Sequence, residues 1–472
     1  IRSMNQKLGK RLFYLGIPAL GVVFCLYYLK IATTDLAYTD YMRLIVSYLP
    51  DVGNPAKFFV PDVLTRVPIT YLGRIINVAL FHYSPAFDMV LGVLSHGLSA
   101  LAIAAYCRGK RGYAPWFLVI MLLLFSLNKW EMLGNGSGWV CFLSIAGFYW
   151  NFVILDRVAG GEERKYDRIF LKALPPLLTL LVAGPYCGSY SLILTLAYGA
   201  LLLKEFRTER TVNREWAFDL AFVLGALGLY LLSSHFAVYE YRGATDASLV
   251  SALLADPKFF VKFFLEAFAS PVLGIEVISG VIKTGKGVCL LGAVVIAFYL
   301  FALYLNVRFR VFERTLFPLL LILTGGVNHC LVFYSRWIFL QENYGMASRY
   351  AIQYEMGIFG ILLTFAAVFS IIKERRADAG RKSLAERILP AAAAVFAVLL
   401  LAGNFYTTRQ ELLKAPLRKE SLRIAEETAL NYKNETDEAL GEALHTDGKR
   451  ARKALEILDE NNLNIFYNKE ER

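Results

Sequence analysis

The sequence predicts an all-α polytopic membrane protein that crosses a bilayer about eleven times. Of its 472 residues, 57% are hydrophobic and 19% are charged, which is too few charges for a soluble protein of this length. The apolar residues occur in separate blocks of about 18 to 22, the length that a helix needs to cross roughly 30 Å of hydrocarbon. Short basic loops separate alternate pairs of these blocks, which is the charge pattern of a helical membrane protein.

Eleven segments are long and apolar enough to cross a membrane. The first is expected to remain as an uncleaved anchor, because no small-residue cleavage site follows it. With eleven spans, the basic N-terminus and all the basic loops lie on one side, which predicts a cytoplasmic N-terminus and an extracytoplasmic C-terminus in the plasma or inner membrane. The predicted spans are residues 12–29, 86–106, 114–129, 138–155, 169–184, 186–203, 217–234, 287–307, 315–336, 350–372 and 388–405. The basic loops are residues 108–111, 157–168, 204–214, 308–314 and 373–387.

One further apolar segment, residues 66–83, is predicted to lie at the membrane interface instead of crossing it. Its polar residues share one helical face and its apolar residues share the other, as in an interfacial helix. They are Arg74 and Asn77 on the polar face, and Ile69, Leu72, Ile76 and Leu80 on the apolar face. Counting this segment as a span would also move every later basic loop to the outside.

The long loops are expected on the outer face. The first, residues 30–85, holds the segment just described and a second amphipathic helix at 39–49. The second long loop is residues 235–286. We therefore predict a membrane domain over residues 1–405 and a small, charged helical tail over residues 406–472 on the same outer face.

Two carboxylates in the first outer loop are the first candidates for chemistry. Asp35 and Asp40 lie five residues apart, directly after the first span. Burial at the membrane boundary raises the pKa of a carboxylate towards that of a useful general base. A helix cap formed by Thr39 or Asp40 explains the same residues without a catalytic role. We expect Asp40 to be the base and Asp35 to support it. If a divalent cation is bound, Mg²⁺ or Mn²⁺, these two carboxylates are its expected ligands.

A carboxylate directly after the first span, followed by interfacial helices, resembles the GT-C superfamily of integral membrane glycosyltransferases. The Ser348-Arg349-Tyr350 turn before the tenth span is similar as well. The resemblance implies an inverting enzyme of the bacterial cell-envelope type that takes its sugar from a polyprenyl-phosphate donor. It also implies an envelope glycan or a lipid-linked saccharide as the acceptor, on the extracytoplasmic face.

The leaving polyprenyl phosphate of such a reaction needs cationic partners, and the guanidinium fork of arginine matches phosphate oxygens. Arg336 and Arg349 flank a short outer loop, with Tyr344 between them. We expect these three residues to bind the donor phosphate. For Arg349, reaching towards lipid headgroups is the alternative role.

Further polar residues are expected to line the acceptor cleft, because aromatic faces and polar edges together bind sugars. His329 is included because a polar group within the membrane is costly unless it is paired or functional. For His96, which is also within a span, a hydrogen bond between helices is the expected role. The predicted cleft residues are Glu131, Tyr239, Glu240, Arg242 and His329.

Other classes of protein fit the sequence less well. The sequence contains no GxGxxG, Walker A, HExxH or CxxC motif, so a nucleotide-sugar donor has no recognisable site. The net charge of +11 lies in the short loops, where the positive-inside bias explains it, and this argues against nucleic acid as a partner. Membrane lipids are expected partners of a chain that crosses the bilayer. A polysaccharide polymerase or an O-antigen-type ligase remains one alternative, and a lipid or solute transporter or flippase is the other.

Overall fold

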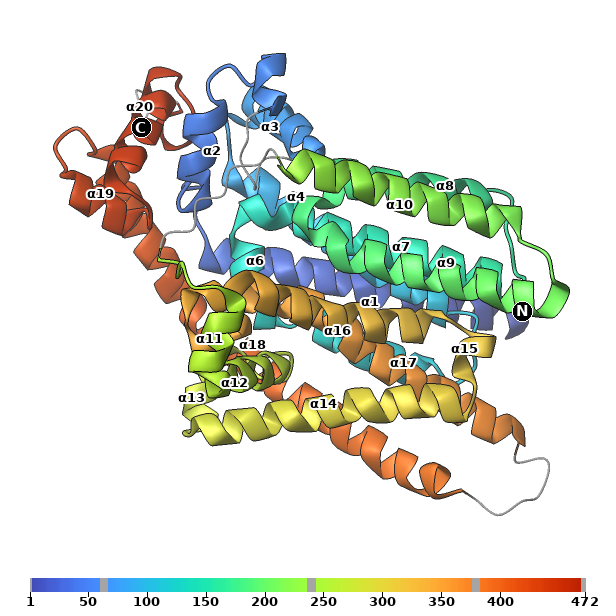
Figure 1. Cartoon of the computed structure of the whole chain (residues 1–472). Coiled ribbons are helices and arrows are strands. Elements are labelled where there is room, and N and C mark those ends of the chain that lie inside the picture. The colour runs from blue at the N-terminus through green and yellow to red at the C-terminus, as the bar shows by residue number, and fades with distance from the viewer. Residues whose placement is uncertain (1, 60–66, 236–242, 376–382, 468–472) are drawn as a thin grey trace.

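The computed structural model describes residues 2–59, 67–235, 243–375 and 383–467 (Figure 1). Within these residues every regular element is a helix, so the predicted all-α class is confirmed. Ten helical stretches of the described chain are long and apolar enough to cross a membrane. The protein is therefore a polytopic helical membrane protein.

The ten stretches match the predicted spans closely. In order, they are Leu8–Ala32 in α1 (Arg2–Ala32), Pro85–Cys107 (α4), Ala114–Gly134 with α5 (Ala114–Leu124) and α6 (Trp130–Gly134), Gly136–Ala159 with α7 (Trp139–Ala159), Asp167–Glu209 with α8 (Asp167–Leu177) and α9 (Cys187–Glu209), Arg214–His235 (α10), Gly285–Arg308 (α14), Phe317–Phe339 with α16 (Phe317–Arg336), Ser348–Arg375 with α17 (Ala351–Arg375), and Leu384–Leu430 (α18). The shorter α-helices are α2 (Asp40–Tyr48), α3 (Pro68–Phe81), α11 (Leu249–Ala255), α12 (Pro257–Ala269), α13 (Ile275–Val281), α15 (Val311–Arg314), α19 (Asp437–Ala443) and α20 (Gly448–Glu460).

The stretch Asp167–Glu209 is 43 residues long, about twice what one crossing needs. It folds back on itself, because both of its ends meet the first turn of α10. Near its start, Lys172 Nζ lies 2.6 Å from Glu215, and near its end Glu205 accepts a hydrogen bond of 3.0 Å from Trp216. The reversal occurs at Gly184, whose φ of 50° favours a residue without a side chain. The boundary predicted between residues 184 and 186 falls at this turn.

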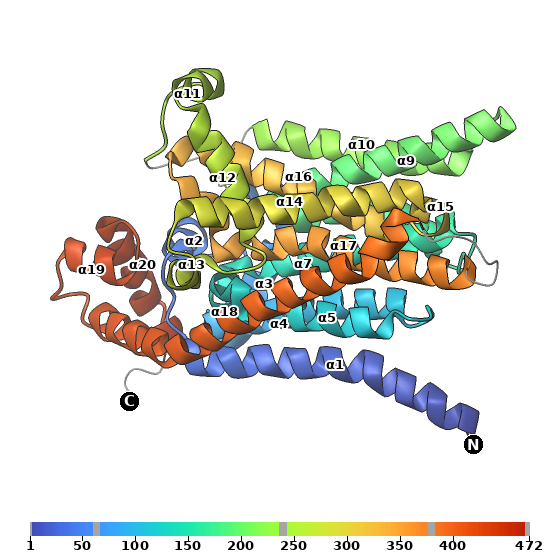
Figure 2. The same ribbon diagram turned by 90° about the horizontal axis from the view of Figure 1, so that it is seen from below.

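The two ends of the helix bundle differ. Figures 1 and 2 show α2, α3, α11 to α13, α19 and α20 at one end, while the N-terminus and α15 lie at the other. All of these shorter helices except α15 thus gather on a single face, as the loop lengths predict. We call this face the outer end, without implying an orientation in a particular membrane.

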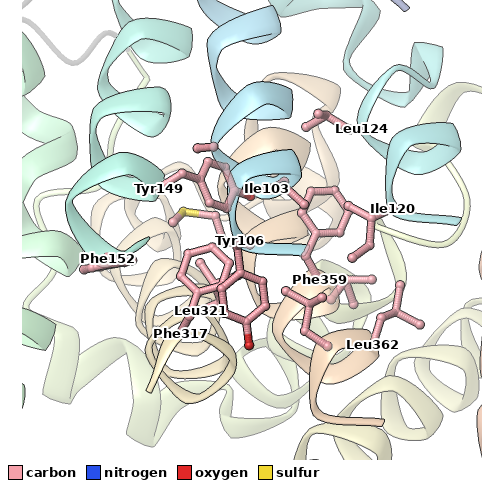
Figure 3. Close-up of a cluster of buried hydrophobic side chains, with 14 of the residues drawn as sticks. Ile103, Tyr106, Ile120, Leu124, Tyr149, Phe152, Phe317, Leu321, Phe359 and Leu362 are labelled. Atoms are coloured by element: carbon pink, nitrogen blue, oxygen red, sulfur yellow. The ribbon is translucent and has the colours of Figure 1, made fainter. Parts of the chain in front are cut away.

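The helices of the bundle pack through a continuous hydrophobic core. Figure 3 shows Tyr106 and Phe317 within it, and their ring centroids are 4.4 Å apart. Helices α16 and α17 approach most closely at Gly325, where a Cβ atom would collide with the backbone of Gly357. Small residues at such crossings are typical of helices that associate within a membrane.

The helix predicted within residues 66–83 is confirmed as α3, with its polar and its apolar residues on opposite faces. Arg74 and Asn77 are buried against the protein, whereas Leu72 and Leu80 are exposed. The apolar face of α3 therefore points away from the protein, as expected for a helix in contact with lipid.

A second hydrophobic core forms at the outer end, between α2 of the first loop and the C-terminal helices. Met42 and Ile45 of α2 are fully buried there, against Leu455 and Leu458 of α20. Helix α18 connects this core to the membrane, because it continues as one helix of 47 residues from Leu384 to Leu430. The predicted boundary between residues 405 and 406 lies inside this helix, where hydrophobicity falls but helix propensity does not.

Candidate functional site

A cavity of about 60 Å³ lies at the outer end, where α2 and α3 cover the first turns of α4 and α7. Several side chains that line it are polar or aromatic. They are Tyr41, Thr70, Arg74, Tyr83, Asp88, Ser137, Trp139 and Tyr186. The volume accommodates a few water molecules or one small polar group of a ligand.

Asp88 and Arg74 place opposite charges in this cavity. Asp88 is 8% exposed, and it accepts a hydrogen bond of 2.8 Å from the Tyr41 hydroxyl. Arg74 is 7% exposed, donates to Thr70 Oγ1 over 3.0 Å, and stacks 3.8 Å from the centre of the Tyr48 ring. Its Nη1 has no hydrogen-bond partner within the described residues. Because a buried donor without a partner is costly, this nitrogen favours an acceptor in the cavity.

Neither Asp88 nor Arg74 is predicted from the sequence as part of the site. Asp88 lies in the first turn of α4, where an acidic residue is ordinarily explained by the positive end of the helix dipole. Arg74 belongs to the predicted polar face of residues 66–83, and a polar face is ordinarily expected to face water. The inward orientation of that face is the indication that links Arg74 to a site.

Asp35 lies beside this cavity and is held in one position. Its Oδ1 accepts hydrogen bonds from Ser84 Oγ at 2.7 Å and from the Ala86 N–H at 2.8 Å, at the start of α4. Although part of the Asp35 side chain is accessible to solvent, removal of water by the surrounding protein raises its pKa, and these two hydrogen bonds oppose the increase. Asp35 is thus a fixed carboxylate with one oxygen, Oδ2, free to accept a proton.

Asp40 is the first residue of α2 and is partly exposed. No hydrogen bond or ion pair of its side chain occurs within the described residues. Between Asp35 and Asp40, only Asp35 is positioned by hydrogen bonds.

Arg349 and Tyr344, expected at the donor phosphate, lie together with Glu131, expected in the acceptor cleft. Arg349 Nη1 is 3.3 Å from Glu131 Oε1, and Nη2 donates to the Tyr344 hydroxyl over 3.1 Å. Ser348 completes the cluster, because its hydroxyl accepts from the Glu131 N–H at 3.3 Å. The Arg349 side chain is 39% exposed, so one edge of this cluster faces solvent.

Arg336 reaches the same cluster through an aromatic ring. Its guanidinium carbon is 5.9 Å from the centre of the Tyr350 ring, and that of Arg349 is 5.4 Å from it. No carboxylate pairs with Arg336 within the described residues, and its buried Nε also lacks a hydrogen-bond partner there. The structure therefore brings both predicted phosphate-binding arginines to one tyrosine and leaves one of them without a counter-charge.

The arginine cluster and the cavity are neighbours. Tyr186 lines the cavity and lies within electrostatic range of Arg336 and Tyr350. Tyr38, between Asp35 and Asp40 in the sequence, connects the first loop to Glu131. Burial raises the pKa of the Tyr38 hydroxyl, and the nearby charge of Glu131 raises it further.

His329, predicted as a cleft residue, is stacked inside the bundle. Its ring lies between those of Phe268 and Tyr354, with centroid distances of 3.7 Å to each. The residue is 1% exposed, and neither ring nitrogen has a hydrogen-bond partner within the described residues. His329 is thus separated from the open face of the arginine cluster by aromatic rings. The hydrogen bond between helices expected for His96 is confirmed, since its Nε2 is 2.6 Å from the Leu124 carbonyl oxygen.

Three predicted cleft residues, Tyr239, Glu240 and Arg242, lie outside the described residues. Among the residues that the structure describes, no three His, Cys, Asp or Glu side chains are grouped to hold a metal ion. Asp35 and Asp40 therefore belong to no such group in this part of the chain.

No family model, curated protein or solved structure matches this chain.

Proposed function

We propose that the protein is an inverting membrane glycosyltransferase of the GT-C type. It transfers a sugar from a polyprenyl-phosphate donor to an envelope glycan or a lipid-linked acceptor. The observation that carries the proposal is Arg336, a half-buried guanidinium without a carboxylate partner in the described chain, which approaches the same tyrosine ring as Arg349. A cation in that situation favours an anionic ligand, and a lipid phosphate reaches it from the surrounding membrane.

In the proposed topology the chain crosses the plasma or inner membrane eleven times. The reversal at Gly184 divides the 43-residue stretch into two crossings, which adds one to the ten helical stretches. With an odd number of crossings, the N-terminus and the C-terminus lie on opposite sides of the membrane. The basic loops then share the side of the N-terminus, and the positive-inside bias makes that side the cytoplasm. The outer end is then extracytoplasmic, where lipid-linked sugars are presented.

The proposed reaction begins when an acceptor hydroxyl attacks the anomeric carbon of the donor sugar. A carboxylate takes the hydroxyl proton as the new C–O bond forms. The bond between the anomeric carbon and the phosphate oxygen breaks, and polyprenyl phosphate leaves with the electron pair. A single displacement of this kind inverts the configuration at the anomeric carbon.

We assign the base to Asp35 and a supporting role to Asp40. Asp35 is fixed by two hydrogen bonds, has a free Oδ2 and has a raised pKa, which all favour proton transfer. Asp40 lacks such positioning, because its side chain makes no hydrogen bond or ion pair within the described residues. This order reverses the one expected from the sequence.

Arg336 and Arg349 are assigned to the phosphate. As the anomeric bond breaks, negative charge grows on the phosphate oxygens, and two fixed guanidinium groups stabilise it. Arg349 already has Glu131 as a partner, at 3.3 Å and partly in solvent. Because a pair so exposed contributes little stability, Arg349 can turn to the phosphate at small cost.

The test is transfer of radiolabelled sugar from synthetic polyprenyl-phosphate sugars by the purified protein in lipid nanodiscs. Asp35→Asn keeps Oδ1 as an acceptor for Ser84 and Ala86 but removes the base, so the rate is expected to fall about 10²- to 10⁴-fold. Asp51→Asn is the matched control, because Asp51 is an exposed carboxylate of the same loop that pairs with Lys57. Its rate is expected to equal that of the wild type.

Arg336→Ala is expected to lower the rate about 10²- to 10³-fold. Arg423→Ala is its control, since Arg423 is exposed on α18 and its ion pairs among the described residues are with Glu420 and Glu427. Equal losses in Asp35→Asn and Asp51→Asn would refute the assigned base. Wild-type protein that transfers no sugar, but scrambles lipid-linked sugars in proteoliposomes, would replace the glycosyltransferase by a flippase.

A further inference from the structure

The last part of the chain is attached to the first outer loop. We use the name C-terminal latch for residues 431–467, which include α19 and α20. The latch and α2 bury their apolar residues in one shared core, although more than three hundred positions separate them in the sequence. Figure 1 shows α20 beside α2 at the outer end, and Figure 2 shows the same contact from below.

One residue of the latch, Asn464, holds the main chain on both sides of Asp35. Its side-chain Nδ2 donates to the Asp35 carbonyl oxygen at 2.7 Å and to the Tyr83 carbonyl oxygen at 3.1 Å, while its Oδ1 accepts from the Ala37 N–H at 3.1 Å. Its own N–H donates to the His82 carbonyl oxygen at 2.7 Å. Every hydrogen-bonding atom of the Asn464 side chain is thus used on the first loop.

These contacts complete the positioning of Asp35. Its side chain is fixed by Ser84 and Ala86 at the start of α4. Its main chain is fixed by Asn464, which also ties residue 37 and residue 83 to the same point. The carboxylate is therefore held from two sides, and one of those sides belongs to the latch.

The latch also holds the turn that presents Asp40. Thr39, directly before it, has a φ of 52° and a ψ of −117°, a conformation that a β-branched residue adopts only under constraint. The Thr39 N–H donates to the Leu444 carbonyl oxygen at 2.8 Å. This hydrogen bond from the latch stabilises the strained turn.

We propose that the C-terminal latch positions the carboxylates of the first loop for catalysis, with Asn464 as the positioning residue for Asp35. The predicted effect on catalysis rests on the proposed glycosyltransferase function, whereas the attachment of the latch to the first loop does not depend on it. The latch does not contact the reacting atoms. It fixes the main chain from which the base projects, and a misplacement of about 1 Å is enough to lower a rate about 10²-fold.

The test uses the full-length protein and the variant Asn464→Gly. Asn464 has a φ of 52°, which glycine adopts freely, so this substitution removes the side-chain hydrogen bonds and keeps the backbone conformation. Asn464→Asp is the second variant, because it retains the acceptor for the Ala37 N–H and loses both donors. Asn461→Ala is the matched control, since the one hydrogen bond of the Asn461 side chain within the described residues goes to the Ile457 carbonyl of the preceding helical turn.

The first measurement is hydrogen exchange of the backbone amides of residues 35–39 in nanodiscs. Asn464→Gly is expected to accelerate exchange at Ala37 about tenfold or more, while Asn461→Ala leaves it unchanged. The same exchange rate in all proteins would overturn the latch, whatever the activity of the enzyme.

The second measurement separates kcat from KM. Asn464→Gly and Asn464→Asp are expected to lower kcat about 10- to 100-fold. The KM for the donor is expected to stay within twofold of the wild type, because no hydrogen bond or ion pair links Arg336 or Arg349 to the latch within the described residues. Faster exchange with an unchanged kcat would refute the positioning role. A wild-type protein that exchanges as expected but transfers no sugar would refute the proposed function and leave the latch in place.

Discussion

Replacing Lys129 by methionine removes the positive charge from an ion pair buried in the membrane bundle. Lys129 Nζ lies 2.7 Å from Glu355 Oε1, and the side chains are 0% and 3% exposed. The ammonium also donates to the carbonyl oxygens of Leu123, Leu124 and Ser126, at 3.1, 2.9 and 3.2 Å. The pair thus joins Glu355 of α17 to Lys129, which lies between α5 and α6 and two residues before Glu131.

The two partners are expected to differ in their importance. Loss of Lys129 leaves the buried Glu355 carboxylate without its counter-charge and takes one donor from each of three carbonyl oxygens, which corresponds to a decrease of about 3–5 kcal/mol in the free energy of unfolding. Glu355→Gln leaves the ammonium with its three carbonyl acceptors and an amide oxygen, so its cost is about 1–2 kcal/mol. The double variant Lys129→Met/Glu355→Leu removes both charges and is expected to recover at least about 2 kcal/mol relative to the sum of the single changes.

The assay is reversible unfolding in mixed micelles with increasing denaturing detergent, for the wild type and the three variants as a double-mutant cycle. Lys129→Met within about 1 kcal/mol of the wild type would refute the reasoning, because the charge would then not be buried and unpaired. A larger cost for Glu355→Gln than for Lys129→Met would also refute it, since the carbonyl acceptors would then contribute nothing.

Three further outcomes follow from individual contacts. Because the pKa of Asp35 is raised and a protonated base is inactive, kcat/KM for sugar transfer is expected to fall with decreasing pH around a pKa above 3.8, and Asp35→Asn should lack this limb of the profile. Gly292→Ala in α14 places a Cβ atom against the Leu265 carbonyl of α12 and is expected to lower the free energy of unfolding by about 1–3 kcal/mol. Gly228→Ala is the control, because open space surrounds Gly228, and equal stabilities of the two variants would contradict the close helix contact. His329→Phe keeps the aromatic stack and removes two ring nitrogens that lack hydrogen-bond partners within the described residues. We expect detergent unfolding to show a free energy of unfolding raised by about 1 kcal/mol, with sugar transfer retained. Lost transfer in a folded variant would show that the imidazole acts in the reaction.

Much of the fold is determined by short-range features of the sequence. Hydrophobic blocks of membrane length predict the spans, because a helix satisfies its own backbone hydrogen bonds and only its length and polarity decide whether lipid accepts it. The periodicity of residues 66–83 predicts α3 and its two faces for the same local reason. The segment with Arg336, Tyr344 and Arg349 is also found locally, since its polar residues stand between two apolar blocks.

Only the tertiary structure decides which of these residues meet. Glu131 pairs with Arg349 across 218 positions, and Asn464 reaches Asp35 across 429. The polar face of α3 turns inward while its apolar face stays exposed, and this orientation buries Arg74 beside Asp88. No periodicity or spacing in the sequence records such pairings, because they depend on how separately stable helices pack against one another and against the first loop. The sequence by itself thus determined the membrane fold and the candidate arginines, and the packing of distant segments decided where the carboxylates lie and what holds them.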